Sequence, residues 1–163
     1  MNGETARRTP GVRHQDTADP ADPAGPRRMV ALDRFEALRL LGGVSFGRVV
    51  FTQHALPAIR PVNHVVDGGD IVIRTHEGAA LVSHTQQAGD PGVVVAYEAD
   101  AIDPATHLGW SVVVTGYARM VTDPRDLARY RAALRPWVHR TMDFTVRIQP
   151  EEITAVRLVP WSE

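Results

Sequence analysis

The apolar residues of this chain change their spacing after residue 43, from a helical period to a period of two. Two segments with the two-residue period, Ala58–Val66 and Ile71–Thr75, are separated by Asp67-Gly68-Gly69-Asp70. Glycine tolerates the positive φ angles that a two-residue hairpin turn requires. The sequence therefore predicts an antiparallel hairpin at this place, which limits the fold to classes built from paired strands.

The other elements are predicted from caps, breakers and periodicity. Asp33 and Glu36 are spaced as an N-cap and the third residue of a helix with an apolar stripe from Phe35 to Leu41, which Gly42-Gly43 ends. The remaining predictions are a strand at Val44–Thr52, a short helix within Glu77–Gln87, strands at Gly92–Glu98 and Trp110–Val121, a helix from Asp123-Pro124 to about Leu134, and final strands at Phe144–Ile148 and Thr154–Val159. This order favours a mainly β protein with a few helices, closed or partly closed into a barrel, over a doubly wound sheet.

The first 28 residues differ in composition from the rest of the chain. They contain Pro10, Pro20, Pro23 and Pro26 and almost no large apolar side chains. Such a segment buries too little surface to offset the entropy of ordering it. We therefore expect a disordered N-terminal arm at residues 1–28, with a short interaction tail as the alternative, and one folded domain at residues 29–163.

Two residue types are absent, and their absence excludes several kinds of chemistry. The chain has no cysteine, which excludes disulfides and thiolate chemistry, and all 18 of its basic residues are arginine. Without lysine it can form no Schiff base, and it has neither the lysine nor the glycine pattern of a Walker phosphate loop. An anionic ligand would have to be held by arginine, backbone amides or hydroxyls.

The charge and hydropathy of the chain narrow the possible partners and location. Its formal net charge is −1, and its arginines are dispersed, so no nucleic-acid role is expected. No apolar run approaches the roughly 18 residues of a membrane span, so no membrane association is expected and a cytoplasmic protein is the default. The histidines show no close metal-binding spacing, so no metal site is expected.

Two places could hold a ligand. Arg60 lies on one strand of the hairpin, and Arg74 and Thr75 end the other strand just before a predicted helix, where an anion is favoured. Trp110 could stack on a planar ligand whose polar edge Ser111 would bind. The alternatives are solvated strand arginines, a core tryptophan and a surface serine.

Four segments then indicate a family. They are Pro57–Asn63, Asp67–Gly69, Ile71–Thr75 and Gly109–Gly116. In order and spacing they resemble the pyridoxamine 5′-phosphate oxidase-like flavin proteins, especially the short actinobacterial and nitroimidazole-resistance-like branch. The similarity spans roughly residues 33–159.

This resemblance implies a split β-barrel homodimer of the FMN-binding type, with FMN in clefts at the dimer interface. Arg60 would contact the phosphate or ribityl chain, Thr75 the phosphate, and Ser111 would lie near the isoalloxazine ring. The backbone of Pro61 to Asn63 would run along that ring. The candidate cofactor-binding residues are therefore Arg60, Pro61, Val62, Asn63, Arg74, Thr75, Trp110 and Ser111.

The chain also departs from the family pattern. Ala79, Ala80 and Leu81 stand where the family usually has basic residues that grip the phosphate, which predicts weak FMN binding unless Arg74 compensates, or a preference for deazaflavin cofactor or haem. The arginine and histidine that bind substrate in true pyridoxamine-phosphate oxidases are missing, so oxidation of vitamin B6 is not expected. We expect a flavin-dependent oxidoreductase that takes electrons from NADH, NADPH or another donor. The alternative is a module that binds or stores flavin, deazaflavin or haem without turnover.

Overall fold

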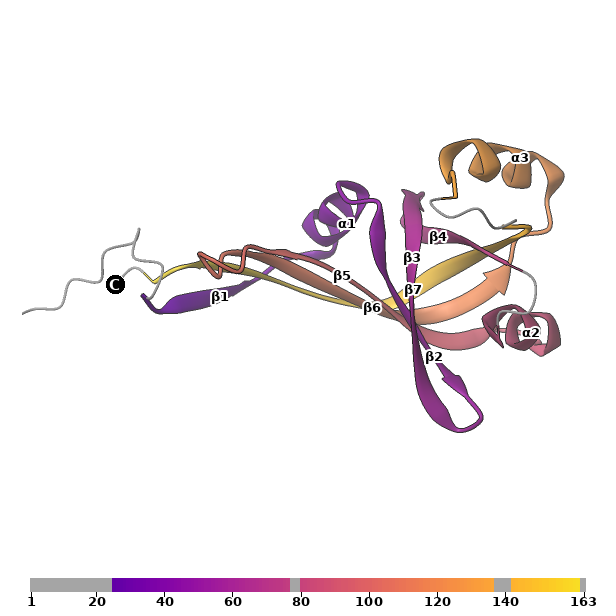
Figure 1. The fold of residues 1–163 in the computed structure, drawn as a ribbon, viewed down its shortest axis with the longest axis horizontal. Coiled ribbons are helices and arrows are strands. Elements are labelled where there is room, and N and C mark those ends of the chain that lie inside the picture. The colour runs from indigo at the N-terminus through magenta and orange to yellow at the C-terminus, as the bar shows by residue number, and fades with distance from the viewer. Residues whose placement is uncertain (1–24, 77–79, 137–141, 162–163) are drawn as a thin grey trace, which may run out of the picture.

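A computed structural model describes residues 25–76, 80–136 and 142–161 of the chain (Figure 1). Seven strands and three helices occur in these ranges. In chain order they are β1 (Arg27–Ala31), α1 (Arg34–Gly42), β2 (Phe46–Gln53), β3 (Leu56–Asp67), β4 (Asp70–Thr75), α2 (Ala80–Gln87), β5 (Val93–Ile102), β6 (Gly109–Met120), α3 (Pro124–Ala133) and β7 (Phe144–Pro160).

The strands form one antiparallel sheet that closes on itself. The sheet runs β7-β4-β3-β2-β5-β6, and β6 pairs again with β7, so the edges of the sheet meet. β1 adds to the far end of β7 and, with the ends of β5, β6 and β7, forms an arm that extends away from the barrel (Figure 1). The expected mainly β split-barrel fold is confirmed.

The predicted hairpin is confirmed in detail. Asp67 pairs with Asp70, and Gly68 and Gly69 take φ angles of 60° and 91°, which side chains with a Cβ rarely adopt. Asp67 also accepts hydrogen bonds from the Tyr130 hydroxyl and, at 2.9 Å, from the Arg129 guanidinium. The turn of the hairpin therefore fastens α3 to the barrel.

β7 corrects one prediction, because the two expected final strands are a single strand of 17 residues. The register with β6 shifts between Thr115 and Gly116, opposite Pro150, which a bulge accommodates. A Cβ on Gly116 would lie 2.0 Å from the carbonyl oxygen of Gln149, so glycine is required for this close approach. The proline interrupts the local pattern but not the strand, because β6 continues to pair with it on both sides.

The N-terminal region also differs from the expectation. Arg27 and Arg28, which the sequence assigned to the arm at residues 1–28, belong to β1, which pairs with Val156–Pro160. The rest of that predicted arm, residues 1–24, lies outside the described residues. No pattern in the neighbouring sequence predicts β1, because the strand segment that pairs with it lies at the other end of the chain.

In α1, Asp33 is the N-cap and accepts from the amide of Glu36 at 2.8 Å, as predicted. Phe35, however, is 78% exposed, whereas Ala37, Leu40 and Leu41 are buried. Two residues correspond to about 200° around a helix, so Phe35 lies opposite Ala37. The expected apolar stripe was therefore too wide.

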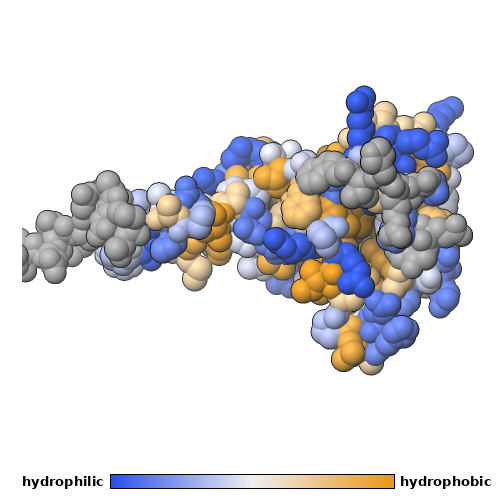
Figure 2. Space-filling view, in the orientation of Figure 1, coloured by the Kyte–Doolittle hydropathy of each residue, from blue (hydrophilic) through white to orange (hydrophobic). Residues whose placement is uncertain are grey.

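The barrel interior holds the main core, built from the inward-facing residues of the strands together with α1 and the first turn of α2. A second, smaller core lies under α3 on the outer face, where Tyr130 and Leu134 pack on Val72. Apolar surface is also visible between α3 and the β2–β3 hairpin (Figure 2). No helix within the described ranges is both long and apolar enough to cross a bilayer.

Candidate functional site

The candidate site lies where two neighbouring strands of the barrel part. β3 and β4 are paired only from His64 and Ile73 to the turn at Asp67 and Asp70. Before His64, β3 pairs with β2 alone, and after Ile73, β4 pairs with β7 alone. A cavity of about 500 Å³ lies in this split.

The lining of the cavity combines an apolar floor with a few polar groups. The apolar part comes from β2, β4, α2 and the chain after α3, and the polar part from β2, the open length of β3 and the end of β4. The lining residues are Phe46, Val49, Phe51, Gln53, Arg60, Pro61, Val62, Asn63, Ile73, Arg74, Thr75, His76, Ala80, Leu81, Pro136 and Met142.

The edge of β3 that faces the split offers backbone groups to a ligand. The amide of His64 donates to the carbonyl of Ser45, which places it on the β2 side of the strand. Because backbone groups alternate along a strand, those of Asn63 and Pro61 face the open edge. Pro61 has no N–H, and proline is tolerated at such an edge. The edge therefore presents a carbonyl at Pro61 and both a donor and an acceptor at Asn63.

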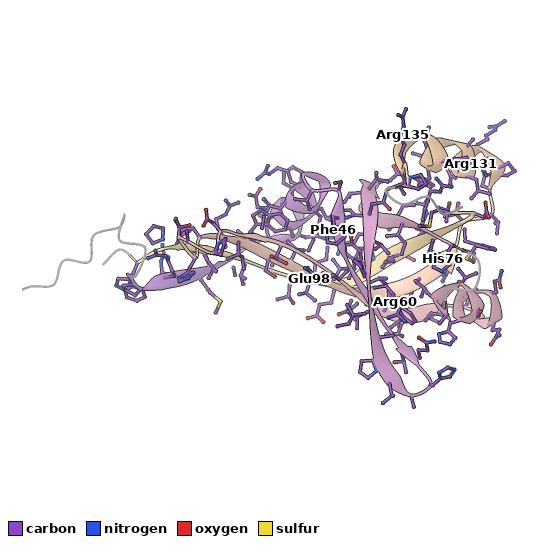
Figure 3. All side chains as sticks on the ribbon, viewed as in Figure 1. Phe46, Arg60, His76, Glu98, Arg131 and Arg135 are labelled. Carbon is purple, nitrogen blue, oxygen red and sulfur yellow. The ribbon has the colours of Figure 1, made fainter. Side chains whose placement is uncertain are left out.

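Arg60 supplies a cation on the inner face of the barrel. It stands directly opposite Val49, a core residue, and directly opposed residues of paired strands share a face. Its guanidinium donates to the carbonyl of Ile59 at 2.8 Å and lies 3.5 Å from the side-chain oxygen of Gln53. Within the described ranges no carboxylate forms a salt bridge with Arg60. Arg60 lies at the base of the β2–β3 hairpin, with His76 beyond it towards α2 (Figure 3).

Arg74 and Thr75 end β4 but point to opposite faces. Thr75 shares the inner face with Ile73 and is 9% exposed. Arg74 is half-buried on the side of α3, where its guanidinium donates to the carbonyl of Leu134 at 2.9 Å and to that of Met142. Burial, and then the neighbouring Arg131, lower the pKa of Arg74.

The comparisons with known proteins place the chain in a family. The sequence profile described as pyridoxamine 5′-phosphate oxidase matches residues 33–161. The chain belongs to this family. The resemblance found in the sequence is thereby confirmed.

Three similar proteins come from Mycobacterium and Corynebacterium species. The chain is 53% identical over 139 residues to the uncharacterized protein Rv0080 of Mycobacterium tuberculosis, covering 85% of this chain and 91% of that one. The structure of an FAD-binding protein from Mycobacterium smegmatis is 37% identical, with a TM-score of 0.64, covering 81% of this chain and 99% of that one. A putative pyridoxamine 5′-phosphate oxidase from Corynebacterium glutamicum is 35% identical, with a TM-score of 0.64 and coverage of 83% and 96%.

Six of the eight candidate residues meet at the cavity of this family member, and two do not. Arg60, Arg74, Thr75 and the run from Pro61 to Asn63 all contribute to its lining. Trp110 is 9% exposed and belongs to the main core. Ser111, the next residue on β6, is half-buried on the outer face, opposite Asp100. Neither residue lines the cavity of its own chain.

Other parts of the lining carried no sequence signal. Pro136 and Met142 reach the cavity only because α3 returns over the barrel, and His76 reaches it as the residue after β4. Ala80 and Leu81, at the positions where the family usually has basic residues, line the cavity without adding charge; Ala79 lies outside the described residues. No metal-binding group of three or more histidine or carboxylate side chains is found among the residues described.

Proposed function

We propose that the cavity binds a flavin, FMN or FAD, and that the protein is a flavin-dependent oxidoreductase. The proposal rests on the split between β3 and β4, where the unpaired edge of β3 lies beside the apolar lining of the cavity. In this family the FAD-binding protein of Mycobacterium smegmatis, 37% identical to this chain, supports FAD as well as the FMN expected from the sequence.

The shape and chemistry of the site suit an isoalloxazine ring. A cavity of about 500 Å³ is within the range of small-molecule pockets. The ring is flat and largely apolar, with hydrogen-bonding groups along one edge. Phe46 and Val49 offer apolar contact, and the backbone of Asn63 and Pro61 offers complementary partners to the polar edge.

The anionic end of the cofactor requires a cation and a hydroxyl. Arg60 and Thr75 both face the inner side of the split, and we assign the phosphate to them. A bound flavin supplies hydride and electron transfer, while the protein binds, orients and excludes water. The described lining contains no carboxylate, in keeping with such a division of labour.

We further propose that NADH or NADPH is the electron donor, that a small aromatic or quinone-like compound is the acceptor, and that the protein is cytoplasmic. Vitamin B6 is not the proposed substrate, because the arginine and histidine that bind it in true oxidases are missing. Steady-state assays with both nicotinamides and a panel of quinones test the donor and acceptor, and cell fractionation tests the location.

The absorption spectrum of the protein as purified tests the cofactor. We expect flavin bands, and we expect Arg60→Ala to fold but to lose flavin. Loss of a charge-assisted hydrogen bond costs about 1.5–3 kcal/mol, or roughly a ten- to hundredfold weaker affinity. Arg125→Ala, which removes an exposed arginine of α3, is the matched control and should keep its flavin. Unchanged flavin content in Arg60→Ala would remove Arg60 from the site.

The second candidate function is binding or storage without turnover. The start of α2 adds only Ala80 and Leu81 to the described lining, which favours weak and exchangeable binding. A yellow protein that NADH or NADPH bleaches at a useful rate supports the enzyme, and a yellow protein that neither reduces supports the storage module. A colourless protein that takes up deazaflavin supports that cofactor instead, and a Soret band would indicate haem, for which His76 lies in the lining.

We also propose a homodimer formed by the outer face of β5 and β6. Val94 is 62% exposed and Val113 39% exposed on this face, and Ser111 lies on the same side. Exposed apolar side chains on a sheet face can belong to an interface between copies of a chain. Ser111, which does not line the cavity of its own chain, would lie in this interface.

Sedimentation tests the dimer. Val113→Asp places a charge in the proposed interface, and we expect it to shift the protein to the monomer. Gln86→Asp, on the exposed side of α2, is the control and should leave the mass unchanged. A Val113→Asp protein that keeps the dimer mass would place the interface elsewhere.

A further inference from the structure

We propose that Arg74 is a positioning residue that holds the end of α3 as a wedge between β3 and β4, and that it does not bind the cofactor phosphate. The wedge keeps the split open and so shapes the cavity. The inference rests on the proposed function in one respect, that this cavity is the flavin site.

The hydrogen-bond ladder shows what the wedge prevents. Because His64 pairs with Ile73, the next pair of a continuing ladder would be Asn63 and Arg74. Both side chains instead bind the chain that follows α3. The Arg74 guanidinium donates to the carbonyls of Leu134 and Met142. The side-chain amide of Asn63 donates to the carbonyl of Arg135 at 3.0 Å. The strands therefore part at the two residues that hold the end of α3.

The bonds to Leu134 and Arg135 satisfy carbonyl groups at the end of α3. The last carbonyls of a helix have no partner within it, and a cation is favoured at that end. Arg74 supplies both the donors and the charge. Leu134 is 2% exposed and packs in the small outer core, which fixes the position of the helix end. Pro136 and Met142, which follow Leu134 in the chain, both line the cavity.

The same helix is fastened at a second place, one turn before Leu134. The Tyr130 hydroxyl donates to Asp67 and accepts from the Arg147 guanidinium at 2.6 Å, which ties the helix to the hairpin turn and to β7. α3 is thus held both at the β3–β4 turn and at the split. A wedge needs both attachments, because a helix fixed only at the turn could swing away from the cavity.

The direction of the side chain separates Arg74 from the phosphate. Successive residues of a strand point to opposite faces, and Thr75 and Ile73 point inward. Arg60 is on that inner face as well, because it stands opposite Val49. Arg74 is on the outer face with Val72, under α3. Arg74 is among the lining residues, but its guanidinium is bonded to the carbonyls of Leu134 and Met142.

Comparison of FMN with riboflavin, which lacks the phosphate, tests the assignment. Riboflavin and FMN are titrated into the apoproteins of the wild type, Arg60→Ala and Arg74→Ala. We expect Arg60→Ala to lose about tenfold or more for FMN and less than about twofold for riboflavin. We expect Arg74→Ala to weaken both ligands by the same factor. A loss confined to FMN in Arg74→Ala would make Arg74 a phosphate ligand and overturn the proposal.

Hydrogen exchange of the apoproteins gives a readout that does not depend on flavin. In Arg74→Ala the amides of residues 130–135 and 142–148 should exchange faster, whereas Arg60→Ala should leave them unchanged. If Arg74→Ala fails to fold, Asn63→Ala carries the test, because it removes the second bond to the same segment. Unchanged exchange in the foldable variants contradicts the wedge. Wild-type protein that binds neither flavin would contradict the proposed function, while the exchange data would still decide the wedge.

Discussion

Replacing Tyr97 by phenylalanine should destabilise the wall that carries the cavity. The Tyr97 hydroxyl lies 2.6 Å from Nδ1 of His64, and Nε2 of His64 lies 2.9 Å from the carbonyl oxygen of Leu41. A carbonyl only accepts, so Nε2 carries the proton, Nδ1 accepts, and Tyr97 is the donor. The chain of bonds joins β5, β3 and the end of α1, one residue from the open edge at Asn63.

The size of the effect follows from burial. Tyr97 is 0% exposed and His64 2% exposed, so water cannot replace the lost hydroxyl. A buried acceptor left without its donor costs about 1–3 kcal/mol. Taking about 2 kcal/mol, the free energy of unfolding falls by that amount and the melting temperature by about 4–8 °C for a chain of this length.

Urea denaturation measures this change at one fixed protein concentration, because association would shift the midpoint. We expect a lower midpoint with an unchanged m-value. Thr52→Val is the control, because it also removes one hydroxyl, but from an exposed side chain of β2. It should change the stability by less than about 0.5 kcal/mol. Equal midpoints for wild type and Tyr97→Phe would refute the assigned tautomer and the energetic importance of the bond.

Two further predictions concern the same region. Burial lowers the pKa of His64 from its usual 6.5, so the folded state favours the neutral ring. The contribution of the neutral ring to the free energy of unfolding is complete above pH 6.5 and is lost as the pH falls through the lowered pKa. Urea midpoints measured against pH should therefore decline on the acid side, and His64→Gln should remove that part of the decline; an identical pH profile would contradict it. Gly47→Ala should destabilise strongly, because its Cβ would lie 2.4 Å from the Tyr97 hydroxyl and 2.6 Å from the Glu98 carbonyl oxygen. Thermal unfolding checks this against Gly89→Ala, where nothing lies within 4 Å and little change is expected.

Much of the fold was predictable because its signals are local. The turn at Gly68-Gly69 and the N-caps Asp33 and Asp123 depend on a few adjacent residues, and all behave as predicted. The single long strand β7 was missed because Pro150 looks like a break until β6 is seen beside it. β1 was missed for a similar reason, since its partner lies at the far end of the sequence.

The site was predictable only in part. Arg60 and Thr75 belong to segments that resemble the family, and both line the cavity. The motif did not reveal the direction of Arg74, since the carbonyls that it binds, at the end of α3 and just before β7, lie 60 and 68 residues further along the chain. Trp110 and Ser111 also looked like one unit in the sequence, but alternation along β6 sends one into the core and the other to the outer face.

The sequence by itself determined the order of the elements from α1 to α3, the hairpin, the family and the residues that offer an anion a partner, because each depends on neighbouring residues or on a motif. Only the tertiary structure decided where β3 and β4 part. That point depends on the position of α3, which is held by residues far apart in the chain. They are Asp67 at the turn, Leu134 in the outer core and Arg74 at the split.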